Sequence, residues 1–409
     1  MNLVINMMEV AIIGGGASGI ACALELKRLN KNLNITILER LDKLGKKILA
    51  TGNGRCNLSN ELINEHCYRS NNDDFLKSIN YEESKQTVKE FFNYLGLLLR
   101  EDNSRLYPYS NMSSSVLDIF KEKLKEENIN IIYDFECIDI IKENNYYNII
   151  SNTKTVTASN VVFASGGKSS KVLGSNGSTY PILQKLGHNI TSLSPGLTSV
   201  KVKENFVKDI KGQRSKVVVK LIKENNLVTE SSGEVLFTEY GLSGICIMDL
   251  SNYIDNDSYK ISIDLMKEFS IDDIKMQIEN RILNNPKVEI KDLLLGIINN
   301  KIGYTLIKSL MINTNKLLKE LTEEEIDLIA KTIKDWSFNI TDKLSYDNSQ
   351  VTCGGIDTSE VNYLTFKSLK NKNIYIIGEL LDIVGLCGGY NLHFAWYSGI
   401  LAARDIVGS

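Results

Sequence analysis

The sequence contains no long hydrophobic run. None of its apolar stretches approaches the roughly eighteen residues that a membrane-spanning helix needs. The N-terminus also lacks the basic region followed by an apolar core that marks a secretory signal. We therefore expect a cytoplasmic protein that has no membrane partner.

Paired cysteines and clustered histidines are absent as well. The three histidines lie far apart, and no two cysteines have C-x-x-C spacing. This distribution disfavours a metal site and the redox dithiol of a disulfide reductase. We expect most of the cysteines to be reduced core residues. The seven cysteines are Cys22, Cys56, Cys67, Cys137, Cys246, Cys353 and Cys387.

Neither sign of charge is in large excess. The chain has 47 lysines and arginines against 50 aspartates and glutamates, a formal charge of −3 and a pI near 5.9. This balance gives no electrostatic footprint for nucleic acid. Lys46, Lys47 and Arg55 lie in one segment, but a phosphate-bearing cofactor explains them equally well. No serine–histidine–acid set or carboxylate pair is apparent that would compete for the chemistry.

A short apolar run that breaks into glycines is the most informative feature present. Residues 10–13 read as a strand, and residues 20–29 are compatible with a helix. Between them, Gly14, Gly16 and Gly19 have the G-x-G-x-x-G spacing. The first glycine permits the turn, the second admits a pyrophosphate to the backbone, and the third lets helix and strand pack closely. The helix start then offers N–H groups to a phosphate.

An acid at the expected distance strengthens this motif. Residues 35–38 are a second β-rich run, which ends at Glu39, twenty residues after Gly19. A carboxylate there can accept hydrogen bonds from the two hydroxyls of an adenosine ribose and disfavours a 2′-phosphate. The motif predicts a dinucleotide site, and the alternative is a structural glycine-rich turn.

Three later segments also combine glycines with the ends of strands. Residues 45–60 form a glycine-rich stretch without periodicity, which predicts a loop close to a ligand, the alternative being a surface turn. Residues 160–167 and 374–391 each read as a buried strand that ends in small residues. The carboxyl ends of these strands should face one elongated ligand. So large a cradle favours FAD over NAD, with Asp382 near the ribityl or pyrophosphate region and the helix over residues 392–406 beginning at the flavin.

The length of 409 residues predicts two or three domains. Residues 1–194 and 346–409 both combine buried strand patterns with glycine-rich turns. They predict one nucleotide-binding domain made from both chain ends. Residues 195–267 contain short β-rich runs, as in an antiparallel sheet or small barrel. Residues 268–345 carry helical stripes and a capping-box sequence at Thr322 to Glu325. Residues 105–110 read as an aromatic-rich connection, for which packing is favoured over a pocket wall.

These residues resemble a bacterial family of FAD-binding oxidoreductases that includes the aminoacetone oxidases and a bile-acid-pathway flavin reductase. The resemblance covers nearly the whole chain. It implies an α/β fold, a Rossmann-like FAD-binding domain with an inserted β-barrel-like unit and helical unit. It also implies that Cys137 lies where the family presents backbone to adenine. The most specific stretches are residues 14–19, 45–60, 233–238, 378–382 and 388–391.

Motifs and resemblance together give a set of cofactor-binding candidates. Arg55 and Asn57 are also candidates for the substrate side of the flavin, because their loop should run close to it. The full set is Gly14, Gly16, Ala17, Ser18, Gly19, Glu39, Arg40, Lys46, Lys47, Thr51, Gly52, Gly54, Arg55, Cys56, Asn57, Cys137, Ala164, Ser165, Gly166, Gly378, Glu379, Asp382, Gly389, Tyr390, Asn391 and Leu392.

Some positions depart from the family pattern. Ser178 and Thr179 stand where an acid and a glycine are usual, Ile245 replaces a proline, and His393 replaces a glutamine. A histidine near the flavin suggests proton transfer. A packed or solvated histidine is the favoured interpretation.

We expect an FAD-dependent oxidoreductase that acts on a small organic molecule, with hydride passing to or from flavin N5. No second G-x-G-x-x-G unit is present, so NAD(P)H would dock transiently in a reductase. In the alternative, an aminoacetone-like amine oxidase, oxygen reoxidises the flavin. Two further classes are a tRNA-modifying flavoprotein, which the acidic balance disfavours, and a non-catalytic FAD-binding protein. The sequence leaves the substrate, the electron donor and the oligomeric state open.

Overall fold

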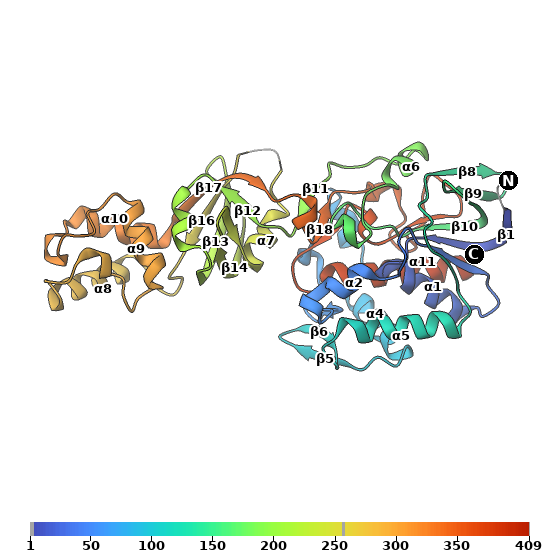
Figure 1. Ribbon diagram of the computed structural model, residues 1–409, viewed down its shortest axis with the longest axis horizontal. Helices are drawn as coiled ribbons and strands as arrows, with labels where there is room; N and C mark the ends of the chain where they lie inside the picture. The colour runs from blue at the N-terminus through green and yellow to red at the C-terminus, as the bar shows by residue number, and fades with distance from the viewer. Residues whose placement is uncertain (1–3, 256–257, 409) are drawn as a thin grey trace. The chain divides into compact units, whose positions relative to one another are not determined.

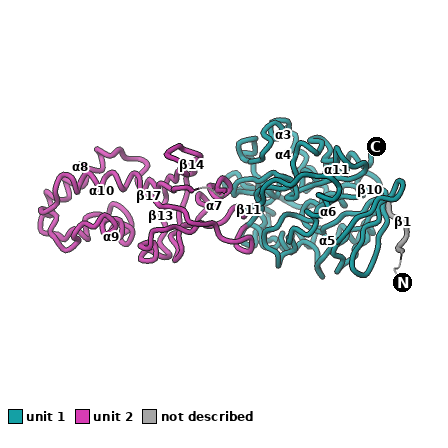
Figure 2. Tube along the Cα trace, turned by 90° about the horizontal axis from the view of Figure 1, so that it is seen from above, with its two compact units in different colours: residues 1–194, 350–409 teal, residues 195–349 magenta. Residues whose placement is uncertain are grey.

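The computed structural model describes residues 4–255 and 258–408, which form two units (Figure 1, Figure 2). Unit 1 comprises residues 1–194 and 350–409, and unit 2 comprises residues 195–349. Unit 1 is thus built from both ends of the chain, whereas unit 2 is continuous.

The centre of unit 1 is a mixed sheet that has seven strands among the described residues. Its order is β7-β2-β1-β10-β9-β8, and β19 pairs with the carboxyl half of β10. Strands β7, β2, β1, β10 and β19 are parallel, and β8 and β9 form an antiparallel hairpin. The bounds are β1 (Val4–Ile13), β2 (Ile35–Leu38), β7 (Asn130–Ile132), β8 (Asp139–Glu143), β9 (Tyr146–Ile150), β10 (Thr155–Phe163) and β19 (Ile374–Ile376).

The parallel strands end level with one another. Ile13 is in register with Leu38 on one side and with Phe163 on the other, and Phe163 is in register with Ile376. Residues 10–13 and 161–163 are buried, as is typical of parallel strands that are covered on both faces. The expected α/β fold with aligned carboxyl ends is confirmed, and the residues that follow these strands meet at one edge.

Helices and small sheets complete unit 1. The helices are α1 (Ala17–Leu29), α2 (Lys46–Ala50), α3 (Asp73–Lys77), α4 (Tyr81–Tyr94), α5 (Ser113–Glu126), α6 (Tyr180–Lys185) and α11 (Tyr390–Gly408). The short strands are β3 (Ser59–Asn60), β4 (Tyr68–Arg69), β5 (Leu99–Asp102), β6 (Arg105–Pro108), β18 (Val351–Cys353) and β20 (Val384–Gly385), and β11 (Ser194–Gly196) leads out of the unit.

Two predicted loops are more ordered than expected. Residues 45–60 contain α2 and β3, because Ile48 is buried and Ser59 pairs with Leu106. Residues 105–110 are not a connection: β6 is the middle strand of the sheet β3-β6-β5. Tyr107 within it is buried, in agreement with the packing role.

Unit 2 consists of a closed antiparallel barrel and a group of helices. The barrel order is β12-β15-β14-β13-β16-β17. The strand β17 lies within residues 268–345, where only helices were expected, and it closes the barrel by pairing with β16 and β12. The bounds are β12 (Val200–Val202), β13 (Arg214–Lys223), β14 (Asn226–Phe237), β15 (Gly241–Ser243), β16 (Lys260–Asp264), β17 (Trp336–Lys343), α7 (Ile245–Ser251), α8 (Ile271–Asn284), α9 (Asn300–Ser309) and α10 (Glu323–Lys334).

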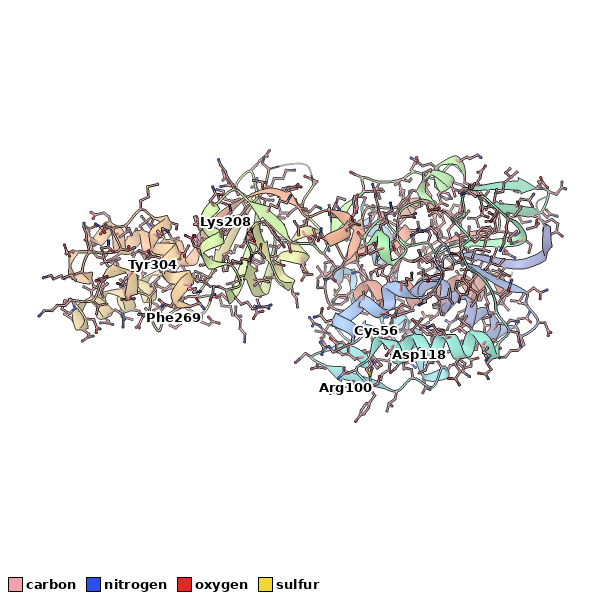
Figure 3. The ribbon with its side chains drawn as sticks, viewed as in Figure 1. Cys56, Arg100, Asp118, Lys208, Phe269 and Tyr304 are labelled. Atoms are coloured by element: carbon pink, nitrogen blue, oxygen red, sulfur yellow. The ribbon has the colours of Figure 1, made fainter. Side chains whose placement is uncertain are left out.

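The helices of unit 2 pack through the stripes that the sequence predicts. Ile274, Ile278 and Ile333 are buried in one apolar core with the barrel. The capping box at the start of α10 is present: Thr322 accepts from the N–H of Glu325, whose carboxylate accepts from the N–H of Thr322. Two large side chains, Phe269 and Tyr304, remain exposed on this part (Figure 3).

Candidate cofactor site

The three glycines of the first turn have different surroundings. Gly14 has a φ of +111°, and a Cβ there would lie 2.5 Å from the carbonyl oxygen of Ala164. A Cβ on Gly19 would lie 2.1 Å from the carbonyl oxygen of Gly14. A Cβ on Gly16 would meet nothing within 4 Å. Gly14 and Gly19 therefore serve the fold, and Gly16 presents its backbone to open space.

Glu39 follows the neighbouring strand and is tied to this turn. Its Oε2 accepts from the N–H of Gly15, and its Oε1 accepts from the N–H of Leu41, both over 2.8 Å. Burial raises the pKa of Glu39, and these two N–H groups oppose the rise. Because each carboxylate oxygen has a second lone pair, Glu39 can also accept from a ribose hydroxyl.

Arg40 and Cys137 lie beside Glu39. The N–H of Phe135 donates to the carbonyl of Glu39 over 2.9 Å, and Cys137 follows two residues later. Cys137 is buried, which raises the pKa of its thiol to about 12. Arg40 donates from Nη2 to the carbonyl of Gly174 over 3.1 Å, while its buried Nε has no partner.

The turn after β10 lies directly against the first glycine turn. The N–H of Ala164 donates to the carbonyl of Ile13 over 2.8 Å. Gly166 has a φ of +73°, and a Cβ there would lie 2.7 Å from Oγ of Ser175. Ser165 shares a 2.6 Å hydrogen bond with Thr179, one of the positions that depart from the family pattern.

Residues 46–57 bring several candidates to the same edge. Lys47 forms an ion pair with Glu379 over 2.7 Å, and Glu379 also accepts from the N–H of Thr352. Lys46 instead pairs with exposed Asp42 over 2.7 Å. The predicted cofactor ligands Lys47 and Glu379 thus neutralise one another.

The backbone between α2 and β3 is folded tightly. Gly52, Gly54 and Cys56 have φ values of +57°, +83° and +58°. Thr51 donates from Oγ1 to the carbonyl of Ile48 over 2.6 Å. Cys56 is buried in unit 1 (Figure 3), and burial raises the pKa of its thiol to about 11. A thiol with so high a pKa is a poor nucleophile.

Arg55 packs on Tyr107 of the β6 strand. Its guanidinium carbon lies 4.6 Å from the centre of the Tyr107 ring, and Nη2 donates to the Tyr107 hydroxyl over 3.4 Å. The Arg55 side chain is 44% exposed. The structure does not pair Arg55 with Asn57, the other residue expected on the substrate side.

Residues 385–389, which we call the second glycine turn, precede α11. Asn391 closes it by accepting from the N–H of Gly385 over 2.8 Å and donating to the carbonyl of Gly385 over 2.9 Å. The carbonyl of Tyr390 accepts from the hydroxyl of Tyr68, and Leu392 packs on the core. Asp382 precedes this turn in the sequence, and its carboxylate accepts a hydrogen bond from the N–H of Asn71 over 3.2 Å. Burial raises the pKa of Asp382.

Helices α1 and α11 pack against each other (Figure 1), and they run in the same direction because Gly399 lies on Ser18 and Arg404 reaches Glu25. A Cβ on Gly399 would lie 2.4 Å from the carbonyl oxygen of Ser18, and Arg404 Nε lies 3.3 Å from Glu25 Oε1. Gly378 lies over Ser18, because a Cβ on Gly378 would lie 2.7 Å from Oγ of Ser18. Tyr390 precedes Gly399 by nine residues, so α11 begins about 13 Å beyond the start of α1. Both helices present their N-terminal ends toward the same side.

His393 is fully enclosed. Its Nδ1 lies 2.8 Å from Oγ of Ser59, and its Nε2 lies 3.1 Å from Oγ of Ser84. Burial lowers its pKa to about 3. A neutral imidazole with both nitrogens hydrogen-bonded agrees with the packed histidine that the sequence favours. Such a group does not transfer protons at neutral pH.

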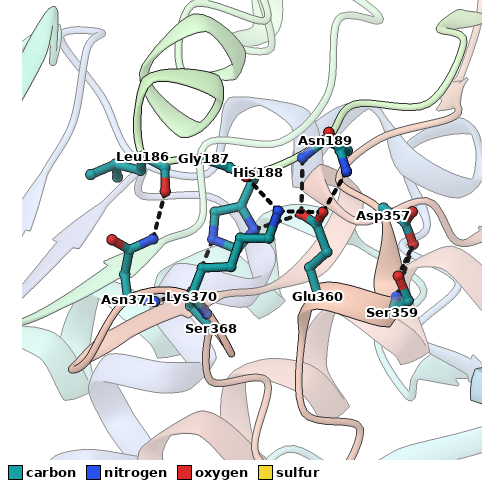
Figure 4. Close-up of polar contacts among 10 residues, drawn as sticks. All are labelled: Leu186, Gly187, His188, Asn189, Asp357, Ser359, Glu360, Ser368, Lys370 and Asn371. Carbon is teal, nitrogen blue, oxygen red and sulfur yellow. Dashed lines mark hydrogen bonds and ion pairs between the residues drawn. The ribbon is translucent and has the colours of Figure 1, made fainter.

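One polar cluster was missed by the sequence analysis (Figure 4). His188 Nε2 lies 2.9 Å from Oγ of Ser368, and Nδ1 lies 3.1 Å from Glu360 Oε2. A serine–histidine–acid set is therefore present, contrary to expectation. Ser368 is buried, however, and its hydroxyl already accepts from the N–H groups of Lys370 and Asn371.

The remaining bonds of this cluster join two loops of unit 1. Glu360 accepts from Lys370 Nζ over 2.6 Å and from the N–H of Asn189 over 2.9 Å. Burial lowers the pKa of His188, whereas Lys370 and the hydrogen bonds to Glu360 lower the pKa of that carboxylate despite burial. The cluster fastens residues 186–189 to residues 357–371. His188 is 172 residues from Glu360 and 180 residues from Ser368, so no local sequence pattern indicates these contacts.

The described part of the chain forms neither a cluster of metal-ligating side chains nor a helix able to cross a membrane. No group of three or more histidines, cysteines, aspartates or glutamates could hold a metal ion there. Likewise, none of the described helices has the length and apolar character required to cross a bilayer.

A parallel sheet whose glycine turns meet at its carboxyl edge defines a dinucleotide-binding protein, and here two helix starts face the same side. Residues 8–405 match the family model described as "HI0933-like protein Rossmann domain", and the chain belongs to this family. The expected family of FAD-dependent oxidoreductases is thereby confirmed.

Curated relatives align over nearly the whole chain. The 3-dehydro-bile acid delta(4,6)-reductase of Clostridium scindens is 32% identical over 97% of this chain and 98% of its own length. The ribosomal RNA dihydrouridine synthase of Escherichia coli is 25% identical over 98% of each chain.

Solved structures share the fold at low identity. A flavocytochrome c3 fumarate reductase in an open conformation has a TM-score of 0.51 and 15% identity, covering 99% of this chain and 79% of that chain. The 3-ketosteroid delta1-dehydrogenase of Sterolibacterium denitrificans has a TM-score of 0.50 and 11% identity, covering 99% and 100%.

Proposed function

We propose that the protein is an FAD-dependent reductase that saturates a carbon–carbon double bond conjugated with a carbonyl group in a small organic molecule. The observation that carries the proposal is the parallel alignment of α1 and α11, whose starts are offset by about 13 Å along the helix axes. FAD carries its pyrophosphate and its ring system at opposite ends of the ribityl chain. Two parallel helices whose starts are offset along their axes can direct N–H groups at both ends of such a molecule.

The residues present fit this cofactor. Open space next to Gly16 leaves room for a pyrophosphate, and Glu39 retains lone pairs for ribose hydroxyls. Near α11, the amide oxygen of Asn57 is buried without a partner. Gly16 and Ala17 would hold the pyrophosphate, Glu39 the ribose, and residues 389–392 the flavin ring.

FAD supplies hydride transfer when it is bound. The chain contributes position and electrostatics: the N-terminal end of α11 favours an electron-rich ring edge, and α1 favours the pyrophosphate. Ion pairing with Glu379 neutralises the Lys47 ammonium at this edge of unit 1.

The substrate class follows from the chemistry that two relatives share by name. A delta(4,6)-reductase of a 3-dehydro compound saturates double bonds near a ketone, and a dihydrouridine synthase saturates the ring double bond of uridine next to a carbonyl. Hydride adds to the β carbon and a proton to the α carbon, so a ketone-conjugated alkene becomes a saturated ketone. NAD(P)H, docking transiently, is the proposed reductant.

An anaerobic stopped-flow experiment tests this function. The yellow holoenzyme is reduced with dithionite and mixed with 2-cyclohexenone, with cyclohexanone and cyclohexene as matched controls. We expect reoxidation of the flavin by the conjugated ketone alone, with cyclohexanone as product. A colourless protein that takes up no FAD would overturn the proposal. Reduction of the flavin by aminoacetone, with peroxide formed in air, would support the oxidase alternative instead.

A second candidate is reduction of uridine in RNA. The full-length likeness to ribosomal RNA dihydrouridine synthases favours it, whereas the formal charge of −3 gives no attraction for RNA. Both candidates reduce the same kind of bond. Reoxidation of the reduced enzyme by ribosomal RNA, with dihydrouridine formed and 2-cyclohexenone inert, would favour the RNA substrate.

A further inference from the structure

An unsatisfied amide oxygen lies beside the start of α11. Asn57 is 8% exposed, and its Oδ1 is buried without a hydrogen-bond partner. A Cβ on Gly389 would lie 2.6 Å from this oxygen, so Oδ1 is next to the backbone of the second glycine turn. A buried acceptor without a donor destabilises the folded state, because it has lost its hydrogen bonds to water. A ligand N–H at this point would remove the penalty.

The segment that carries Asn57 is fixed against α11 by three contacts. Asn60 Nδ2 donates to the carbonyl of Gly388 over 2.9 Å, and Trp396 Nε1 donates to the carbonyl of Leu58 over 3.0 Å. Ser59 Oγ lies 2.8 Å from Nδ1 of the enclosed His393. These contacts hold the backbone that follows Asn57 against the start of α11.

We propose that Asn57 accepts a hydrogen bond from N3–H of the flavin. This inference rests on the proposed function. The pyrimidine edge of oxidised flavin has acceptors at N1, O2 and O4, and N3–H is its one donor. The start of α11 supplies N–H groups for the acceptors, so the donor needs an acceptor from elsewhere. Asn57 provides one, and it therefore orients the cofactor instead of contacting the substrate.

The test compares two cofactors on the full-length apoprotein. Dissociation constants are measured by fluorescence quenching for FAD and for N3-methyl-FAD, which lacks this donor. We expect the unsubstituted protein to bind FAD at least about tenfold more tightly than N3-methyl-FAD. In Asn57→Ala the two constants should agree within about twofold, whereas Asn57→Asp, which keeps an acceptor, should retain the preference.

Asn60→Ala is the matched control, since it removes a neighbouring amide whose two polar atoms already have partners in the protein: Nδ2 donates to the carbonyl of Gly388, and Oδ1 accepts from the N–H of Leu62. This substitution should weaken the binding of FAD and of N3-methyl-FAD equally, so the ratio of the two dissociation constants should not change. Equal binding of the two cofactors by the unsubstituted protein would overturn the inference, as would an undiminished preference in Asn57→Ala. In either case FAD still binds, so the proposed function stands. Failure of the unsubstituted protein to bind FAD would overturn both.

Discussion

Gly15 donates its backbone N–H to Oε2 of Glu39 over 2.8 Å. The acid expected to bind the ribose therefore also closes the glycine turn, because its other oxygen accepts from Leu41. One side chain thus combines closure of the turn with the predicted contact to the ribose.

Glu39→Ala should reduce both stability and FAD affinity. Loss of two acceptors for buried N–H groups predicts a decrease of about 2 kcal/mol or more in the free energy of unfolding of the apoprotein. Loss of charged hydrogen bonds to the ribose predicts weaker FAD binding by roughly 1.5–3 kcal/mol. Glu39→Gln keeps one acceptor, so its stability and its FAD affinity should lie between those of the unsubstituted protein and those of the alanine variant. Urea unfolding and FAD titration measure the two effects; unchanged values in the alanine variant would contradict these roles.

Gly16→Ala and Gly19→Ala should have opposite profiles. A Cβ on Gly16 meets nothing within 4 Å, so the apoprotein should unfold at an unchanged urea midpoint while FAD binds at least about tenfold more weakly. A Cβ on Gly19 would lie 2.1 Å from the carbonyl oxygen of Gly14, which predicts a loss of several kcal/mol, on the order of 3. Equal effects of the two substitutions on the apoprotein would argue against this division.

Saturating FAD should raise the melting temperature. At about a thousand times the dissociation constant, binding adds roughly 4 kcal/mol of stability. Gly16→Ala at the same FAD concentration should gain less. A melting temperature that does not move in verified apoprotein would count against an FAD site.

His393 should make stability depend on pH. Burial lowers its pKa from 6.5 to about 3, so below pH 6.5 the unfolded chain binds a proton that the folded chain does not. Stability then falls with decreasing pH by about 1.4 kcal/mol per unit, or about 2 kcal/mol between pH 6.5 and 5. His393→Gln, which can still bond to both serines, should lose this contribution. Identical pH slopes in urea unfolding would rule out the neutral buried imidazole.

Ser368→Ala should affect stability and not chemistry. The hydroxyl bonds to His188 and accepts from two backbone N–H groups, so its removal should cost about 1–3 kcal/mol in the free energy of unfolding. Flavin reduction should be unaffected. The unsubstituted protein should not react with a fluorophosphonate probe. Labelling of Ser368 by the probe would instead indicate a nucleophilic serine.

Features of the site that depend on neighbouring residues could be predicted from the sequence. The spacing of Gly14, Gly16 and Gly19 and the position of Glu39 are set within one strand–turn–helix unit. Local apolar patterns also indicated the strands over residues 10–13 and 35–38 and the helical stripes within residues 268–345. The capping box at Thr322 depends on only four consecutive residues.

Long-range pairings could not be predicted from these patterns. Asn57 meets Gly389, and Ser368 meets His188, only because the chain returns to unit 1 after unit 2. The strand β17 follows three helices, and its register with β12 and β16 depends on the closed barrel. Lys47 and Glu379 each suggest a cofactor ligand separately, whereas their ion pair emerges only in three dimensions.

The discontinuity of unit 1 has a consequence for synthesis on the ribosome. Unit 2 is complete in sequence at residue 349, whereas β19 and α11 of unit 1 are translated afterwards. Since domains generally fold as units, unit 2 can reach its native state first. The face of α1 that α11 covers therefore has no partner until residues 390–408 have been synthesised. The proposed cofactor site, which includes the start of α11, is thus completed after unit 2 and not with the N-terminal fingerprint.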